Sequence, residues 1–265
     1  MAGLASRGAA NRAGLADRAA ANHDAPPVPW MPMSKSDPLR PNSFDHVALW
    51  AADRDAIAEL LCGSLGMHVI DRSDRFTLVG ADARRGKLTL FDARGPRRNG
   101  ALAHVALRVS DLDRALSALP EDLELERADG EIRFDAPEGL RLGLVEVPGT
   151  DLEYDIDHVV LRVSDVDAAA DGFVALGFER DGNRLTIGDK EIRLDGGGAP
   201  EGDDPLLNHI AVLVDSADRV EQEARRRGAE VADVVDAANT LAVFVWGPDR
   251  IKVEYVEHKP SFSLV

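Results

Sequence analysis

Four histidines of this 265-residue chain occupy equivalent positions in short apolar segments. They are His46, His104, His158 and His209, separated by 58, 54 and 51 residues. Val or Ile follows each histidine and two further apolar residues complete the segment, which is typical of a buried strand. Imidazole is the commonest metal ligand among the side chains. A histidine that recurs at one strand position suggests a metal site that was duplicated together with its fold.

A carboxylate near the end of the chain can complete such a site. Alternation along residues 250–256 puts Glu254 on the polar face of a strand, and the same alternation puts His158 and His209 on the polar faces of theirs. Two imidazoles and one carboxylate with open positions beside them suit iron(II) and tolerate manganese(II). We therefore predict His158, His209 and Glu254 as the metal ligands.

The first half of the chain lacks a carboxylate at the matching position. Pro248 precedes Glu254 by six residues, and six residues after the equivalent Pro137 stands Gly143. His46 and His104 are therefore predicted to be remnants of a site without its third ligand, unless Asp92 or Glu146 supplies one. A lone strand histidine is more often a hydrogen-bonded core residue than a ligand.

The elements that must position these side chains repeat with the histidines. After each strand comes an apolar-periodic helix, which begins at a capping pair such as Ser110-Asp111 or Ser164-Asp165. Two of the helices stop at Leu65-Gly66 and Leu176-Gly177, where glycine can adopt the left-handed conformation. Short alternating runs follow each helix. The repeating unit is predicted to be βαβββ, and the fold class α+β.

One such unit leaves a sheet face uncovered, so the four modules are predicted to pair into two domains. We place the boundary at residues 148–151, which gives an N-terminal domain over 41–150 with a degenerate site and a C-terminal domain over 151–265 with the metal site. Residues 1–40 are rich in Ala, Arg, Asn and Pro, and we predict that they form a disordered tail.

Composition excludes several classes of function. The net charge of −16, from 47 acidic and 31 basic residues, argues against a nucleic-acid or anionic-membrane partner. The sequence contains no run of 18 apolar residues, which is the length that a membrane-spanning helix requires. A single cysteine, Cys62, excludes an intrachain disulfide and fits a reducing compartment. We therefore expect a cytoplasmic protein.

The repeated His-Val-Ala-Leu strands, the Leu-Gly-Phe stop and the Gly-Pro-Asp turn before Glu254 resemble the vicinal oxygen chelate superfamily over about residues 43–258. This superfamily contains glyoxalases, bleomycin resistance proteins and extradiol dioxygenases, and four modules in one chain look most like the last. The resemblance implies an iron(II) site that binds a catechol-like substrate through both oxygens, with dioxygen beside it. The assisting family histidine falls near Lys190 and the family tyrosine falls on Phe244, so Lys190 and His258 are the remaining catalytic candidates.

Two other functions remain open. Because the assisting histidine and tyrosine are absent, the metal could act as a Lewis acid in an isomerase, lyase or glyoxalase-like enzyme without oxygen chemistry. The chain could also be a non-catalytic binding or resistance protein that holds a small molecule between modules. Exposed modules make a homo-oligomer plausible.

Overall fold

The computed structural model describes residues 37–198 and 204–265, and they contain the predicted fourfold repeat of one strand, one helix and three strands. The first module comprises β1 (Ser43–Ala51), α1 (Arg54–Ser64), β2 (His68–Arg72), β3 (Phe76–Gly80) and β4 (Lys87–Asp92). The second comprises β5 (Leu102–Val109), α2 (Leu112–Ser117), β6 (Glu126–Ala128), β7 (Glu131–Asp135) and β8 (Arg141–Glu146), with the 3-10 turn η1 (Pro137–Gly139) before β8.

The other two modules repeat the pattern. The third comprises β9 (Ile156–Arg162), α3 (Val166–Ala175), β10 (Glu179–Asp181), β11 (Arg184–Ile187) and β12 (Lys190–Asp195). The fourth comprises β13 (Leu207–Leu213), α4 (Ala217–Arg226), β14 (Val231–Asp236), β15 (Thr240–Trp246) and β16 (Lys252–His258), with the 3-10 turn η2 (Pro248–Arg250) before β16. The α+β class and the βαβββ unit are therefore confirmed.

The predicted helix ends are also present. Asp111 and Asp165 cap α2 and α3, and each side chain accepts a hydrogen bond from the backbone N–H three residues on. Gly66 and Gly177 follow α1 and α3 with φ of 63° and 94°, the left-handed conformation that stops a helix. These local signals were sufficient because capping depends on residues only a few positions apart.

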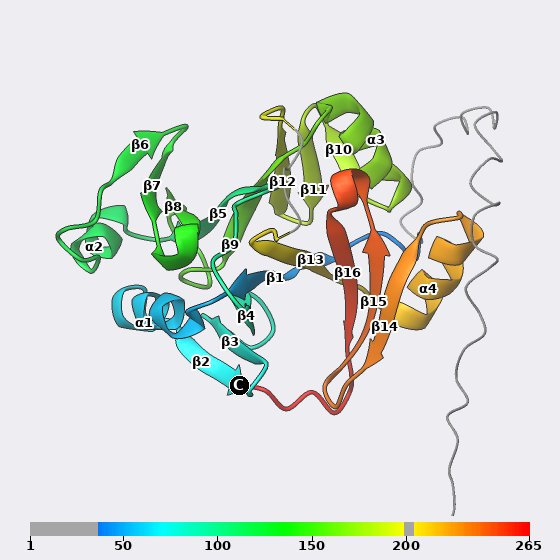
Figure 1. Ribbon diagram of the computed structural model, residues 1–265, viewed down its shortest axis with the longest axis horizontal. Coiled ribbons are helices and arrows are strands. Elements are labelled where there is room, and N and C mark those ends of the chain that lie inside the picture. The colour runs from blue at the N-terminus through cyan, green and yellow to red at the C-terminus, as the bar shows by residue number, and fades with distance from the viewer. Residues whose placement is uncertain (1–36, 199–203) are drawn as a thin grey trace, which may run out of the picture. The chain divides into compact units, whose positions relative to one another are not determined.

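The modules pair in a nested order to form two eight-stranded sheets (Figure 1). Modules 1 and 4 form the outer-module sheet, in the order β14-β15-β16-β13-β1-β4-β3-β2. Modules 2 and 3 form the inner-module sheet, in the order β10-β11-β12-β9-β5-β8-β7-β6. At the centre of each sheet two histidine-bearing strands run antiparallel, β1 beside β13 and β5 beside β9.

This pairing corrects the predicted domains 41–150 and 151–265. The boundary predicted at residues 148–151 lies between β8 and β9, two strands of the same sheet. The chain instead changes sheet between β4 and β5 and again between β12 and β13, and Arg98, before β5, pairs with Pro205, before β13. Each module offers the same kind of open strand edge, so adjacency along the chain does not decide which two edges join.

One apolar core connects all four modules. Buried side chains from both sheets belong to a single contiguous cluster, and the described residues form one compact unit. The helix α1 packs on β2–β4 and also meets η1, while α3 packs on β10–β12 and also meets η2. The apolar sheet faces are thus covered by helices, which leaves the histidine-bearing faces for the sites.

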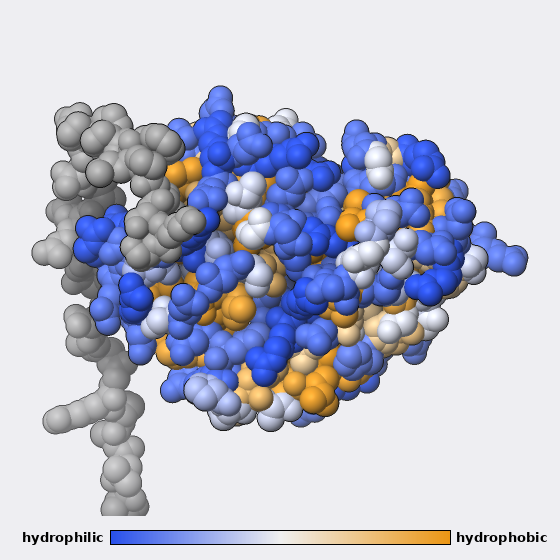
Figure 2. All heavy atoms as spheres, turned by 180° about the vertical axis from the view of Figure 1, so that it is seen from behind, coloured by the Kyte–Doolittle hydropathy of each residue, from blue (hydrophilic) through white to orange (hydrophobic). Residues whose placement is uncertain are grey.

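Residues 1–36 of the predicted tail lie outside the described residues. Its last four residues are ordered: Leu39 is completely buried and Asp37 pairs with Arg227 at 2.6 Å. No helix in the described part of the chain is long and apolar enough to cross a membrane. Figure 2 shows one face of the surface as mostly hydrophilic, with hydrophobic residues in separate patches.

Candidate metal centres

Each sheet carries one buried group of two histidines and one glutamate. The outer-module site consists of His46, His209 and Glu254. The inner-module site consists of His104, His158 and Glu131. In both groups the potential ligand atoms lie within 4.8 Å of one another. All four repeated histidines therefore take part, two in each group.

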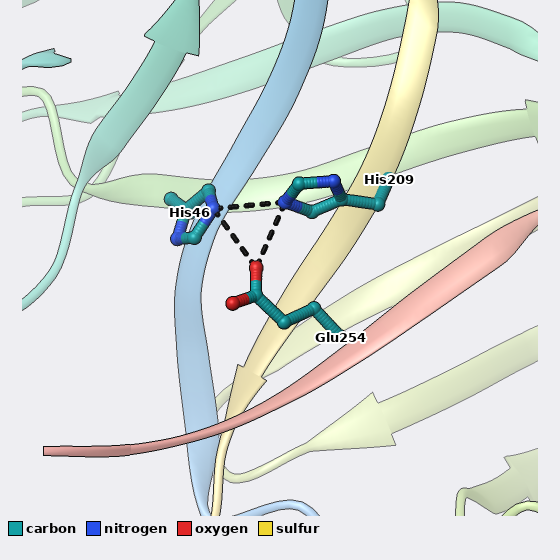
Figure 3. A group of neighbouring side chains, drawn as sticks. All are labelled: His46, His209 and Glu254. Carbon is teal, nitrogen blue, oxygen red and sulfur yellow. Dashed lines mark hydrogen bonds and ion pairs between the residues drawn. The ribbon is translucent and has the colours of Figure 1, made fainter. Parts of the chain in front are cut away.

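The ligand atoms of the outer-module site form a nearly equilateral triangle (Figure 3). The Nε2 atoms of His46 and His209 are 3.1 Å apart, and they lie 3.2 Å and 2.8 Å from Oε2 of Glu254. Ligand atoms about 2.1 Å from an octahedral ion and at right angles to each other are separated by about 3.0 Å. The triangle matches one face of such an octahedron.

Strand register explains why these three side chains meet. In the β1–β13 pair, His46 is opposite Ala211 and His209 is opposite Ala48, so the two imidazoles lie diagonally on the same face. Glu254 on β16 is level with Ala211 on the neighbouring β13. Three adjacent strands thus present their ligands to one point, and the small alanines leave room for them.

The structure corrects one member of the predicted ligand set. His209 and Glu254 are together as predicted, but their partner is His46, and His158 belongs to the inner-module site. The cause is the nested pairing, which places module 4 beside module 1 instead of module 3. His46 and His104, predicted as remnants, are members of complete groups. Asp92 and Glu146 belong to neither group.

The inner-module site obtains its carboxylate from a different strand. Gly143 on β8 is level with Ala106 on β5, just as Glu254 is level with Ala211, so the carboxylate is absent there as predicted. Glu131 on β7 supplies it instead, with Oε1 3.0 Å from His104 Nε2 and Oε2 3.5 Å from His158 Nε2. A Cβ at Gly143 would lie only 2.6 Å from Glu131 Oε2. Glycine at 143 therefore makes the space that Glu131 occupies.

Sequence reasoning missed Glu131 because the search followed a single strand position. One sequence signal was available: Asp or Asn precedes three of the four histidines. Asp45, Asp157 and Asn208 each accept a hydrogen bond from Nδ1 of the next residue, at 2.7, 2.7 and 3.0 Å. Such a contact fixes the ring and leaves Nε2 as the free acceptor. The pattern marks His46, His158 and His209 alike as oriented for ligation.

The buried carboxylates are ionised at neutral pH. Burial opposes ionisation of Glu254, but the adjacent His209 and His46 outweigh it and lower the pKa of Glu254 to about 2. Burial likewise opposes ionisation of Glu131, but the adjacent His104 and Arg133 outweigh it and lower the pKa of Glu131 to about 2. Burial disfavours charge on His46, yet Glu254 and Asp45 raise the pKa of His46 to about 9. Burial lowers the pKa of His209.

The donor atoms of both sites fit a divalent cation. In the outer-module site both Nδ1 atoms are engaged by their acceptors, so the two Nε2 atoms face each other and need a proton or a metal ion between them. In the inner-module site His104 Nε2, His158 Nε2 and Glu131 Oε2 are buried without a hydrogen-bond partner among the described residues. Buried polar atoms without partners are rare, and one ion would satisfy all three.

The two catalytic candidates have different surroundings. Lys190 is buried, with Nζ 2.6 Å from Asp155 Oδ1, and it belongs to neither group of ligands. His258 is connected to a ligand histidine through Asp45. Its Nε2 is 2.6 Å from Asp45 Oδ2, and the other oxygen of Asp45 accepts a hydrogen bond from Nδ1 of His46. His258, the last residue of the strand that carries Glu254, therefore lies beside the outer-module site.

Comparison with known proteins agrees with this architecture. Residues 43–123 match the Glyoxalase/Bleomycin resistance protein/Dioxygenase superfamily. No curated protein matches the chain significantly. A candidate dioxygenase from Bacillus subtilis subsp. subtilis str. 168 superposes with a TM-score of 0.69 at 18% identity, over 84% of this chain and 87% of that one. Glyoxalase I from Zea mays gives 0.64 at 17% identity, over 81% and 92%.

The cppA protein from Streptococcus pneumoniae TIGR4 has the same fold, with a TM-score of 0.53 at 14% identity over 82% of this chain and 98% of that one. At these identities the likenesses establish the fold and leave the reaction to the chemistry of the sites. The superfamily match is thus confined to residues 43–123, while the fourfold βαβββ repeat and the paired sheets of the described chain share the fold of these structures.

Proposed function

We propose that the chain is a metal-dependent enzyme that acts at the outer-module site on a small, catechol-like chelating molecule, with extradiol ring cleavage as its reaction. The observation that carries the proposal is the triangle of His46, His209 and Glu254, with sides of 2.8–3.2 Å. Such a triangle occupies one face of an octahedral ion and leaves the opposite face for substrates. Iron(II) is the preferred ion, and manganese(II) is the alternative.

The residue on β4 that corresponds to Glu254 on β16 supports a site with three protein ligands. Thr89 on β4 is level with Ala48 on β1, as Glu254 on β16 is level with Ala211 on β13. A site with one carboxylate from each module would need an acidic residue at position 89. Threonine there limits the charge of the ligand set to a single carboxylate, which fits a ferrous site open to a dianionic diol.

Aromatic side chains beside His209 support a flat substrate. The rings of Phe244 and Phe91 are centred 5.1 Å and 6.1 Å from the imidazole, and Trp50 lies 5.5 Å from Phe91. All three aromatic residues are only partly buried, so they leave apolar surface for contact. Aromatic surfaces bind other rings through stacked or edge-to-face contacts.

His258 and Asp45 are proposed as the residues that position the ligand His46. Asp45 accepts hydrogen bonds from both His46 and His258, and it also pairs with Lys87 at 2.9 Å. His258 stacks on Phe262, with ring centres 4.3 Å apart. Asp45 keeps His46 oriented for ligation, while His258 is a positioning residue that connects this buried pair to the C-terminal segment. A ferrous ion would supply the means to activate dioxygen next to the diol.

A non-oxidative reaction is the second candidate, and Phe244 is the observation that favours it. Phe244 is directly opposite Glu254 on the neighbouring strand, where the resemblance expects a tyrosine hydroxyl. Phenylalanine cannot donate a hydrogen bond to a substrate oxygen. An isomerase or lyase that uses the metal only to polarise a carbonyl would not need that donor.

The test is oxygen uptake by iron-loaded protein. The protein is purified without oxygen, loaded with iron(II) and mixed with a panel of catechols, and oxygen consumption and the yellow ring-fission product are recorded. We expect uptake with at least one catechol, and we expect Glu254→Gln to abolish both uptake and ion retention at this site. Glu131→Gln is the matched control and should retain uptake.

Three results would contradict the proposal. Uptake that persists in Glu254→Gln would place the reaction elsewhere in the molecule. If no catechol gives uptake but the hemithioacetal of methylglyoxal and a thiol is isomerised, the non-oxidative candidate is correct. Binding of a catechol without any turnover would indicate a small-molecule binding protein.

A further inference from the structure

A cavity lined by arginines lies next to the inner-module site. It has a volume of about 550 Å³, within the range of small-molecule sites. His104 of the triad and Arg133, which donates hydrogen bonds to Glu131, both line it. The cavity therefore lies beside the buried group of ligands, with the side chains of His104 and Arg133 between the two.

The charge of the cavity wall is unusual for this chain. In a protein with a net charge of −16, five arginines and two aspartates line this one cavity. The arginines are Arg133, Arg141, Arg162, Arg184 and Arg193, and the aspartates are Asp129 and Asp195. Such a concentration of positive charge in a concave surface favours an anionic ligand.

Arg162 is the arginine with no carboxylate partner. Its only side-chain hydrogen bond among the described residues is to the backbone oxygen of Leu102, at 3.3 Å. Arg193 and Arg184 share Glu191, at 2.5 Å and 3.5 Å. A guanidinium without a carboxylate partner on a cavity wall can bind a carboxylate or phosphate through two parallel hydrogen bonds.

The other two arginines pair mainly with exposed acids. Arg133 contacts Asp129 as well as the buried Glu131, and Arg141 contacts Asp135 and Glu126. Exposed ion pairs contribute little to stability. An incoming anion can therefore replace Asp129 or Asp135 at small cost.

Arg193 also occupies a significant position in the strand register. Arg193 on β12 is paired with Val160 on β9. The corresponding position in the other half of this sheet is Gly143 on β8, which is paired with Ala106 on β5. In the outer-module site the two corresponding positions hold Thr89 and Glu254. The inner-module site thus has a cation where the outer site has a neutral hydroxyl. The two sites of one chain therefore differ in the charge of the molecule that they suit.

We propose that the inner-module site is a second metal centre, and that it binds a small molecule with at least two carboxylate or phosphate groups. One anionic group would face the ion held by His104, His158 and Glu131, and the other would face Arg162 and Arg193. This ligand differs in class from the flat aromatic molecule proposed for the outer-module site. The inference stands independently of whether the outer-module site cleaves catechols.

The first experiment counts ions. Full-length protein is equilibrated with manganese(II), and bound metal is measured by elemental analysis and by electron paramagnetic resonance. We expect two ions in the unsubstituted protein and one in each of Glu131→Gln and Glu254→Gln. The ion that remains in each variant serves as its folding control.

A second variant tests the same centre without altering a ligand. Gly143→Ala should release the inner ion alone, because the added Cβ displaces the Glu131 carboxylate. Its control is Gly63→Ala, which meets no atom within 4 Å and should keep both ions. Two ions retained in both Glu131→Gln and Gly143→Ala would overturn the second metal centre.

The second experiment measures anion binding by calorimetry. Manganese-loaded Glu254→Gln, which keeps only the inner ion, is titrated with inorganic phosphate and separately with tricarballylate, both weak chelators in solution. We expect at least one to bind, and Arg162→Gln to weaken its binding about tenfold. Arg75→Gln, at an exposed arginine in the bend between β2 and β3, should change nothing.

The two probes separate phosphate from carboxylate ligands. Tighter binding of tricarballylate indicates a polycarboxylate, and tighter binding of phosphate indicates a phosphorylated ligand. Equal affinity for Glu131→Gln and Glu254→Gln would overturn the proposed anion site, as would binding that Arg162→Gln leaves unchanged. Failure of catechol cleavage would alter none of these readings, because none of the measurements depends on turnover of a catechol.

Discussion

The residue that precedes each histidine determines which imidazole nitrogen faces the ligand triangle. Asp45, Asp157 and Asn208 accept from Nδ1, whereas His104 follows Ala103 and has no such neighbour. Residues that orient a metal-bound histidine in this way contribute about ten- to a hundredfold to metal affinity. The contribution of these neighbours can be measured one site at a time.

Asn208→Ala should weaken metal binding at the outer-module site about tenfold. The substitution removes the acceptor of His209 Nδ1, and Asn208 makes no other side-chain hydrogen bond with a described residue. Competition with a fluorescent chelator measures the affinity of each site, with Glu131→Gln as the background so that only the outer ion is observed. The same substitution in Glu254→Gln is the control and should leave the inner ion unaffected. Unchanged outer-site affinity would contradict the orienting role.

At the scale of elements, the two 3-10 turns hold the sheets together. Asp249 in η2 accepts hydrogen bonds from the backbone N–H and the hydroxyl of Ser164, at 2.6 and 2.7 Å. Glu138 in η1 accepts one from the backbone N–H of Ala52, at 2.9 Å. Each carboxylate thus contacts the backbone just before a helix that packs on the other sheet. The turns that contain Pro137 and Pro248 are thus also contacts between the two sheets.

Close packing accompanies this contact at η2. A Cβ on Gly172 of α3 would lie 2.5 Å from the ring of Pro248, so glycine lets the turn approach the helix. The hydroxyl of Tyr255 on β16 donates to the backbone oxygen of Leu176 at the end of α3. The fourth module is therefore joined to the third through the side chain of Tyr255 on its last strand as well as through the turn.

Asp249→Ala should lower the free energy of unfolding by about 1–2 kcal/mol, because it leaves two donors of Ser164 without their acceptor. Urea denaturation followed by circular dichroism measures the change. Asp249→Asn is the matched variant, since it keeps one acceptor and tolerates the left-handed backbone at this residue, where φ is 50°. A loss in the asparagine variant as large as in the alanine variant would contradict the hydrogen-bond explanation.

At the scale of the whole molecule, the nested pairing makes the modules interdependent. Modules 1 and 4 come from opposite ends of the described chain, yet they share a sheet and a site. Modules 2 and 3 are consecutive and share the other sheet. One core cluster runs through all four. Folding of either half of the sequence alone would leave open strand edges and uncovered apolar faces.

A chain limited to residues 41–150 should therefore fail to fold cooperatively. It would contain β1 without β13 and β5 without β9, and so it would lack half of each sheet. Thermal melting and limited proteolysis measure the outcome. Coexpression with residues 151–265 is the control and should restore a cooperative transition and two bound ions. A cooperative melt of 41–150 alone would show that neighbouring modules can pair with each other.

Local features of this fold were predictable from the sequence. The fourfold unit, the caps at Asp111 and Asp165 and the stops at Gly66 and Gly177 depend on residues within one turn or one strand. The faces of the histidine strands followed from alternation alone: Val159 and Leu161 are in the core, and Arg162 lines the inner cavity. Two members of the outer-module site, His209 and Glu254, were found because they lie on the first and last strands of one module.

The tertiary structure alone decided which modules pair, and with that the third member of each site. All four modules offer similar open edges, so no local pattern distinguishes His46 from His158 as the partner of His209. Glu131 needed a further fact, the space over Gly143 on the neighbouring strand. The sequence by itself thus determined the module, its histidines and their faces, because these depend on short-range backbone geometry. Strand pairing between modules determined the sites, because it depends on how the whole core packs.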